Sequence, residues 1–140
     1  MSSHSPLTLV MVDDNMDEIF LTRRQLRREG VVNNFVSEKR PERLIESLQE
    51  LEKLGVDKNR IMILLDVNMP RENGFETLKK LRANPEFQNV PILMLSASDD
   101  ESDMFESFEL GANGYIVKPL KADELFAALS NVQSVRYQLV

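Results

Sequence analysis

IMILLD, at residues 61–66, is a short apolar run that ends in a carboxylate. Two further runs, LTLVMV at residues 7–12 and ILML at residues 92–95, are likewise flanked by polar or turn residues. Apolar runs without strict alternation are typical of strands that are covered on both faces, as in parallel sheets. Weaker strand candidates lie at residues 35–36 and 115–117, so we expect five strands.

Segments with helical periodicity separate these expected strands. The first runs from Asn15 to Glu29 and places Met16, Ile19 and Leu26 on one face. The other helices are expected at residues 41–54, around Phe75, Leu78 and Leu81 up to Asn84, from Met104 and Phe108 to Gly111, and along Leu125, Ala128, Leu129 and Val132. Strand and helix alternate five times over short connections, which indicates a single α/β domain with helices on both faces of an open parallel sheet.

The composition excludes several kinds of site. The 140 residues include no cysteine, so disulfides, thiolate zinc sites and cysteine nucleophiles are ruled out. The single histidine is His4, in a polar N-terminal stretch, which leaves none for a catalytic triad or a metal site in the body of the domain. Hydrophobic residues make up 42% of the chain, enough for one compact core.

Charge and hydropathy bear on partners and location. The formal net charge is -6 and the basic residues are scattered, so we expect no binding to nucleic acid. No apolar run approaches the ~20 residues that a bilayer span requires, and Met1 to Pro6 lacks the features of a signal peptide. We therefore expect no membrane partner and a cytoplasmic location.

Polar side chains stand where the expected strands end. Asp13 and Asp14 follow the first strand, Asp66 ends the third, Ser96 ends the fourth and Lys118 follows the fifth. In open α/β sheets, ligands bind at the carboxyl ends of the strands, near the point where strand order reverses. We therefore expect these side chains to converge on one site.

The carboxylates of this site repel one another strongly unless a cation lies among them. Mg²⁺ is the natural choice, because it prefers oxygen ligands and usually takes one or two carboxylates. We expect Asp14 and Asp66 as direct ligands, with Asp13 orienting a metal-bound water. A carboxylate beside Mg²⁺ and a lysine can act as a nucleophile toward phosphorus. Lys118 and the Ser96 hydroxyl would then stabilise the charge on the transferred phosphoryl group.

Several motifs together carry a family resemblance. They are Val12-Asp13-Asp14, Leu65-Asp66-Val67-Asn68-Met69-Pro70, Gly74, Ser96-Ala97 and Gly111-Ala112-Asn113-Gly114-Tyr115-Ile116-Val117-Lys118-Pro119. In this order the sequence resembles the receiver domain of two-component response regulators. The resemblance implies a flavodoxin-like (βα)5 fold, with a doubly wound parallel sheet in the strand order 2-1-3-4-5. It places the receiver domain at residues 7–136, with tails at residues 1–6 and 137–140 and no output domain.

The resemblance also implies residue roles. It implies that a sensor histidine kinase or a histidine phosphotransfer protein phosphorylates Asp66, and that Asp14, Asp66 and the backbone carbonyl of Asn68 bind Mg²⁺. Lys118 would contact the phosphoryl group, and Ser96 would donate a hydrogen bond to it. Such a domain is no enzyme acting on outside substrates: it catalyses only its own phosphorylation and dephosphorylation, and its output is phosphorylation-dependent binding to another protein.

Three further positions match the family pattern. Tyr115 stands where an aromatic side chain rotates inward as the Ser96 loop closes, and the bond from Lys118 to Pro119 matches one that is cis in the family. Gly74, before the third helix, fits a turn that requires positive φ.

A narrower resemblance concerns stand-alone receivers that are paired with phytochrome-type kinases. The acidic run at residues 99–103, the longer second helix and the lack of an output domain point that way. Several such proteins dimerise. A homodimer would give Phe126, Tyr137 and Leu139 a surface to pack against, but these are equally read as ordinary core and tail residues.

Other readings of the same residues stay open at this point. A phosphatase could use the same aspartate chemistry, although Asn68 stands where a second carboxylate would serve as general acid. A pseudo-receiver would only bind proteins, which the full set of charged residues disfavours. In a nucleotide-binding flavodoxin-like protein, Asp13 and Asp14 would repel phosphate. Taken alone, Asp14 is best read as the cap of the first helix.

Overall fold

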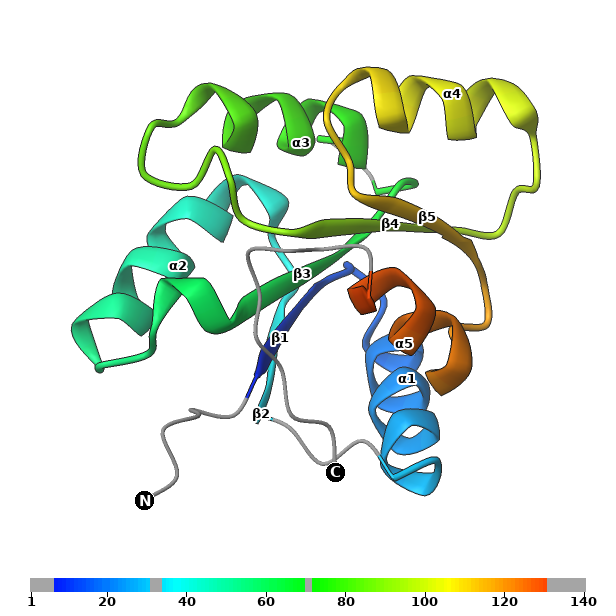
Figure 1. The fold of residues 1–140 in the computed structure, drawn as a ribbon, viewed down its shortest axis with the longest axis horizontal. Helices are drawn as coiled ribbons and strands as arrows, with labels where there is room; N and C mark the ends of the chain where they lie inside the picture. Colours follow the sequence, from blue (N-terminus) through cyan, green and yellow to red (C-terminus); the bar gives the residue numbers. More distant parts are fainter. Residues whose placement is uncertain (1–6, 31–33, 70–71, 131–140) are drawn as a thin grey trace.

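A computed structural model describes residues 7–30, 34–69 and 72–130 of the chain (Figure 1). Five parallel strands form one sheet in the order β2-β1-β3-β4-β5, which confirms the predicted fold class and strand order. The strands are β1 (Thr8–Val12), β2 (Asn34–Glu38), β3 (Ile61–Asp66), β4 (Ile92–Ser96) and β5 (Gly114–Val117). The α-helices are α1 (Met16–Arg28), α2 (Leu44–Lys53), α3 (Gly74–Ala83), α4 (Glu101–Glu109) and α5 (Ala122–Ser130), and short 3-10 turns, η1 (Pro41–Arg43) and η2 (Lys58–Arg60), precede α2 and β3.

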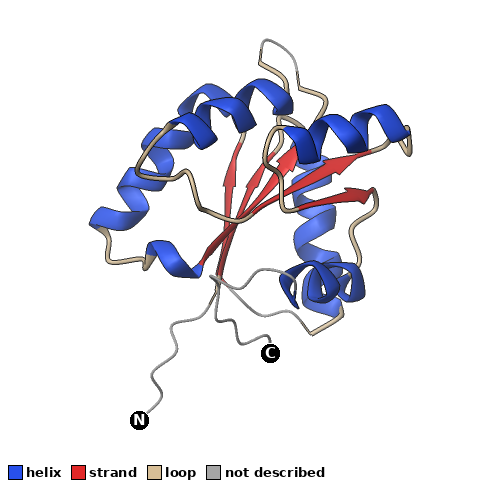
Figure 2. Ribbon diagram, turned by 45° about the horizontal axis from the view of Figure 1, so that its top comes forward, coloured by secondary structure: helices blue, strands red, loops and turns tan. Residues whose placement is uncertain are grey.

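The sheet lies between two layers of helices (Figure 2). Leu26 of α1 and Leu125 of α5 belong to the apolar cluster on one face. Leu48 of α2 and Leu78 of α3 belong to the cluster on the other face, against which Leu110, directly after α4, also packs. Among the described helices, none combines the length and apolar character that spanning a bilayer requires.

β3 occupies the centre of the sheet and is buried along its whole length. Its Leu65 pairs with Val12 of β1, and its Asp66 pairs with Leu95 of β4. The next residues of β1 and β4 therefore emerge at the same edge as Asp66. The chain passes from β1 to β2 in one direction and then to β3 on the other side, so this edge is the switch point of the sheet.

Asn15, rather than Asp14, caps helix α1. The Asn15 side chain accepts hydrogen bonds from the backbone N–H groups of Asp17, at 2.9 Å, and Glu18, at 3.2 Å. These bonds satisfy donors that the first turn of a helix leaves unpaired. The interpretation of Asp14 as the helix cap is therefore wrong, and Asp14 is left exposed at the end of β1.

Two expected helical features also differ in the structure. Ile19 and Leu26 are buried as predicted, but Met16 is 55% exposed, because it begins the helix beyond the edge of the sheet. The expected helix at residues 41–54 starts with the 3-10 turn at Pro41 and becomes α-helical only at Leu44. The predicted helical position Val132 lies outside the described residues.

Gly74 does not adopt the positive φ that the sequence predicts. Among the described glycines, positive φ occurs at Gly30, Gly55 and Gly111. Gly74 is instead the first residue of α3, and its N–H donates to the Val67 carbonyl at 2.9 Å. A Cβ there would lie 2.3 Å from the backbone oxygen of Asp66, so glycine is required for the close approach of α3 to the end of β3.

Arg82, near the end of α3, forms hydrogen bonds to the turn after α4 and to the residues before β4. Its guanidinium donates to the carbonyl of Gly111 at 2.9 Å, to the carbonyls of Gln88 and Val90 at 3.0 and 2.7 Å, and to Asn113 Oδ1 at 3.0 Å. Burial lowers the pKa of Arg82. The turn between α4 and β5 is thereby tied to α3 and to the start of β4.

Substitution of Gly74 by alanine tests the close approach of α3 to the end of β3. We expect Gly74→Ala to lower the free energy of unfolding by about 3 kcal/mol, because the new methyl group meets rigid backbone rather than a side chain. Gly55→Ala is the comparison: its Cβ meets open space, so only the positive φ of +92 opposes it, at a cost of about 1 kcal/mol. Urea denaturation of both variants measures the difference, and equal losses would contradict this reading of Gly74.

Candidate functional site

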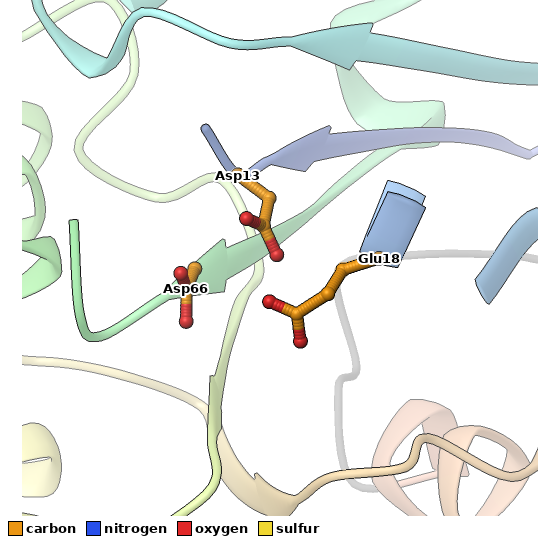
Figure 3. A group of neighbouring side chains, drawn as sticks. All are labelled: Asp13, Glu18 and Asp66. Carbon is orange, nitrogen blue, oxygen red and sulfur yellow. The ribbon is translucent and has the colours of Figure 1, made fainter. Parts of the chain in front are cut away.

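Four elements bring charged side chains to the edge where β1 and β3 end. Asp13 follows β1, Asp66 ends β3 and Lys118 follows β5. Glu18 reaches the same place from the first turn of α1. Figure 3 shows the three carboxylates pointing toward one another. The predicted convergence at this edge is thus present for Asp13, Asp66 and Lys118, and it includes a residue that sequence reasoning did not identify.

The Lys118 ammonium is the hub of this cluster. Its Nζ donates to Glu18 Oε1 at 2.8 Å and to Asp66 Oδ1 at 3.0 Å, and lies 3.5 Å from Asp13 Oδ2. Burial lowers the pKa of Lys118, but the bonds to Glu18 and Asp66 raise it more, so its net shift is upward. Lys118 therefore keeps its positive charge at any physiological pH.

Asp13 and Asp66 are carboxylates in an environment that disfavours their charge. The side chain of Asp13 is fully buried and that of Asp66 is 4% exposed. Burial raises the pKa of Asp13 to about 6, against the opposing effect of a 2.9 Å hydrogen bond from the Asn15 N–H. Burial also raises the pKa of Asp66, while Lys118 and the Asn68 N–H act in the opposite direction.

Ser96 and Tyr115 are connected through the loop that follows β4. Ser96 is fully buried, and its hydroxyl accepts a 3.0 Å hydrogen bond from the Ser98 N–H. The Tyr115 hydroxyl donates to the Ser98 carbonyl at 2.8 Å. The Lys118 N–H donates to the Ser96 carbonyl at 2.7 Å, and the bond between Lys118 and Pro119 is cis, as the family pattern implies.

A buried acid, Glu72, lies just before helix α3. Glu72 is 8% exposed and accepts hydrogen bonds from the Thr77 hydroxyl, at 2.7 Å, and from the Lys80 ammonium. These bonds hold Glu72 to α3, whose first residue, Gly74, donates to the Val67 carbonyl at the end of β3.

The donor set at this edge fits a hard divalent cation. One carboxylate oxygen from each of Asp13, Glu18 and Asp66 lies within 4.8 Å of the others. Three carboxylates face the single ammonium of Lys118, so negative charge is in excess, and oxygen ligands are those that Mg²⁺ prefers. Asp14 is exposed and does not belong to this group, and Asn68 is exposed beside it. Their predicted roles as ligands stay predictions.

Glu18 could have been found from its place in the chain. It lies five residues after Asp13, in the first turn of a helix that starts directly at the functional edge. The side chains of such a first turn are close to the strand end that precedes it. Only the acidic character of this turn, which also suits the helix dipole, was visible in the sequence.

The buried charge of Asp13 predicts a dependence of stability on pH. We expect Asp13→Asn, without divalent cations, to raise the free energy of unfolding at pH 7 by on the order of 2 kcal/mol. The folded protein holds the Asp13 proton up to about pH 6, whereas the unfolded chain releases it near 3.8. Wild type therefore gains stability as the pH falls from 6 toward 4, and the advantage of the variant shrinks there.

Urea denaturation of both proteins in a chelator, from pH 4 to pH 8, measures this difference. Adding Mg²⁺ at pH 7 should reduce or reverse it, because the cation compensates the Asp13 charge. If Asp13→Asn raises the free energy of unfolding by the same amount at pH 4 and at pH 7, the raised pKa of Asp13 is contradicted.

Comparison with known proteins places this site in a family. The family described as "Response regulator receiver domain" matches residues 9–130. The response regulator Rcp1 of Synechocystis sp. is 25% identical over 132 residues, which cover 94% of this chain and 90% of Rcp1. Several other curated relatives are longer, and the chain spans about half of their length.

Solved structures agree with this match. The bacteriophytochrome response regulator AtBRR superposes with a TM-score of 0.81 and 26% identity, over 98% of this chain and 99% of AtBRR. The phosphorylated cyanobacterial phytochrome response regulator RcpA has a TM-score of 0.69 and 26% identity, over 92% of each chain. With the matching fold and the charged cluster at the switch point, these likenesses show that the chain belongs to the response regulator receiver domain family.

Proposed function

We propose that this receiver domain accepts a phosphoryl group on Asp66 in a Mg²⁺-dependent reaction and signals by phosphorylation-dependent binding to another protein. The observation that carries the proposal is the 3.0 Å contact between Lys118 Nζ and Asp66 Oδ1, in a cluster of carboxylates in which both aspartates are buried. Receiver domains are signalling domains that histidine kinases phosphorylate, so we assign the donor to a sensor histidine kinase or a histidine phosphotransfer protein.

The transfer itself needs little covalent chemistry from the protein. A carboxylate oxygen of Asp66 attacks phosphorus, the P–N bond of the phosphohistidine breaks, and the imidazole nitrogen keeps the bonding electron pair and takes up a proton from solvent. Lys118 stabilises the charge on the phosphoryl oxygens. The backbone N–H of Asn68 helps to orient the Asp66 carboxylate. Water then hydrolyses the acyl phosphate, which returns the Asp66 carboxylate and releases inorganic phosphate.

Mg²⁺ would be held by Asp66, Asp14 and the backbone carbonyl of Asn68, as the family resemblance implies, and the neighbouring Asp13 would orient a metal-bound water. Bound there, it neutralises the excess negative charge of the site and of the phosphoryl oxygens. This charge compensation also explains why buried carboxylates are retained at a place where burial raises their pKa values.

The response to phosphorylation would start at Ser96. A phosphoryl group on Asp66 offers strong acceptor oxygens, so the Ser96 hydroxyl would donate to it. That movement displaces the loop to Ser98, whose carbonyl holds the Tyr115 hydroxyl in the unphosphorylated state. Exposed apolar side chains of α4, β5 and α5 lie on the surface that this change would reshape; they are Phe105, Phe108, Val117 and Phe126. A shift between two such states is what a partner would recognise.

The names of two relatives bear on the kinase partner. AtBRR is named as a bacteriophytochrome response regulator and RcpA as a phytochrome response regulator, which supports a phytochrome-type kinase as the donor for this chain. We propose a cytoplasmic location and a receiver domain at residues 7–136. Self-association would use Phe126, which is exposed, while Tyr137 and Leu139 lie outside the described residues.

A phosphatase that acts on outside substrates is less well supported. Asn68 occupies the place of a general acid, and Glu18 is a poor replacement because it accepts a hydrogen bond from Lys118 as a carboxylate. Among the described carboxyl groups around Asp66, that of Asp13 has a pKa raised to about 6, but it is fully buried and accepts a hydrogen bond from the Asn15 N–H, so it is poorly placed to protonate an outside substrate.

Phosphorylation with a small donor tests the proposal. Incubation with phosphoramidate and Mg²⁺ should add one phosphoryl group, visible by mass spectrometry and stable in acid but not in alkali. Asp66→Asn should abolish the adduct. Asp57→Asn makes the same change at an exposed cap of η2 and should leave the adduct unchanged. An adduct on Asp66→Asn, or none on wild type, would count against the assignment.

A further inference from the structure

Lys118 is shared between two carboxylates with different roles. The Nζ atom lies 2.8 Å from Glu18 Oε1 and 3.0 Å from Asp66 Oδ1, so the contact to Glu18 is the shorter of the two. Asp13, at 3.5 Å, is the more distant third neighbour. The group that would stabilise a phosphoryl group on Asp66 is thus already bound by a residue that takes no part in the proposed transfer.

Glu18 differs from its two neighbours in its freedom to move. Its side chain is 38% exposed, whereas that of Asp66 is 4% exposed and that of Asp13 fully buried. Figure 3 shows Glu18 extending from α1 toward the site while the aspartates emerge from the strand ends. Glu18 can therefore turn into water, but Asp13 and Asp66 cannot leave the cluster.

The backbone at Glu18 is held in place by its neighbours. Its N–H is held by the Asn15 cap, and the next residue, Ile19, is buried against the sheet. The contact with Lys118 therefore depends on the orientation of the Glu18 side chain and not on a movement of α1. A substitution of Glu18 can remove the contact without disturbing the helix.

Phosphorylation of Asp66 changes the anionic group that Lys118 contacts. The Asp66 carboxylate carries one negative charge, whereas a phosphoryl group carries about two and adds strong acceptor oxygens. We expect these oxygens to draw the ammonium, which now donates to both Glu18 and Asp66, away from Glu18. Glu18 then loses its cation and keeps its negative charge beside a phosphoryl dianion, so both changes disfavour the phosphorylated state.

We infer that Glu18 is a positioning residue that competes with the phosphoryl group for Lys118 and thereby weakens the retention of that group on Asp66. The inference rests on the proposed function of Asp66 as phosphoryl acceptor and deepens it. Glu18 stabilises the unphosphorylated site by its ion pair and destabilises the phosphorylated site by repulsion. It therefore shifts the equilibrium of this site toward the unphosphorylated state.

Binding of beryllofluoride measures this competition at equilibrium, because the anion occupies the place of a phosphoryl group on the aspartate. With saturating Mg²⁺, titration followed by fluorine NMR yields its dissociation constant. We expect Glu18→Gln to bind beryllofluoride roughly threefold to fivefold more tightly than wild type, the upper part of the range expected for one partly exposed ion pair. Urea denaturation of the same proteins checks that the fold is kept.

Asp17→Asn is the matched control. Asp17 precedes Glu18 in the first turn of α1, carries the same charge and is exposed, while Lys118 donates to Glu18 instead. Its substitution should change the affinity for beryllofluoride less than twofold. Equal affinities of wild type and Glu18→Gln would overturn the inference, as would an equal gain in Asp17→Asn, which would point to net charge alone. If wild type itself binds no beryllofluoride, the proposed function fails first.

Discussion

The attraction of one ammonium, that of Lys118, for several carboxylates is the interaction on which the site depends. The parallel sheet brings Asp13 and Asp66 to adjacent strand ends, where burial raises the pKa of each. Only a cation makes this arrangement tolerable in a protein interior. Lys118 supplies part of that charge, and in the proposed function Mg²⁺ supplies the rest. The proposed reaction at Asp66 thus depends on the excess negative charge of this site, which favours the binding of Mg²⁺.

Much of this arrangement could be predicted from the sequence, because it follows from the geometry of parallel strands. Apolar runs mark β1, β3 and β4, and the polar residues after them must meet at one edge once the strands are parallel. The meeting of Asp13, Asp66 and Lys118 needs no knowledge of loop structure. The strand order itself came from the family resemblance, since periodicity alone does not distinguish one order of five strands from another.

The features that escaped prediction depend on contacts between elements. The sequence predicts a turn at Gly74, but glycine is required there because α3 lies close to the backbone of Asp66. Asn15 caps α1 because of its backbone angles, although Asp14 has an equally suitable side chain. Glu18 joins the cluster through the direction in which α1 leaves the sheet. Such distances and directions arise only when the helices pack.

Arg82 has a consequence for how the domain can move. Its guanidinium holds the carbonyl of Gly111 and the side chain of Asn113, directly after α4, against α3 and the start of β4. The opposite end of α4 follows the loop in which Tyr115 holds Ser98 by a single hydrogen bond. The end of α4 at Gly111 is therefore held by more hydrogen bonds than the end that follows Ser98, so we expect a displacement of the Ser98 loop to move the first turn of α4 more than its last.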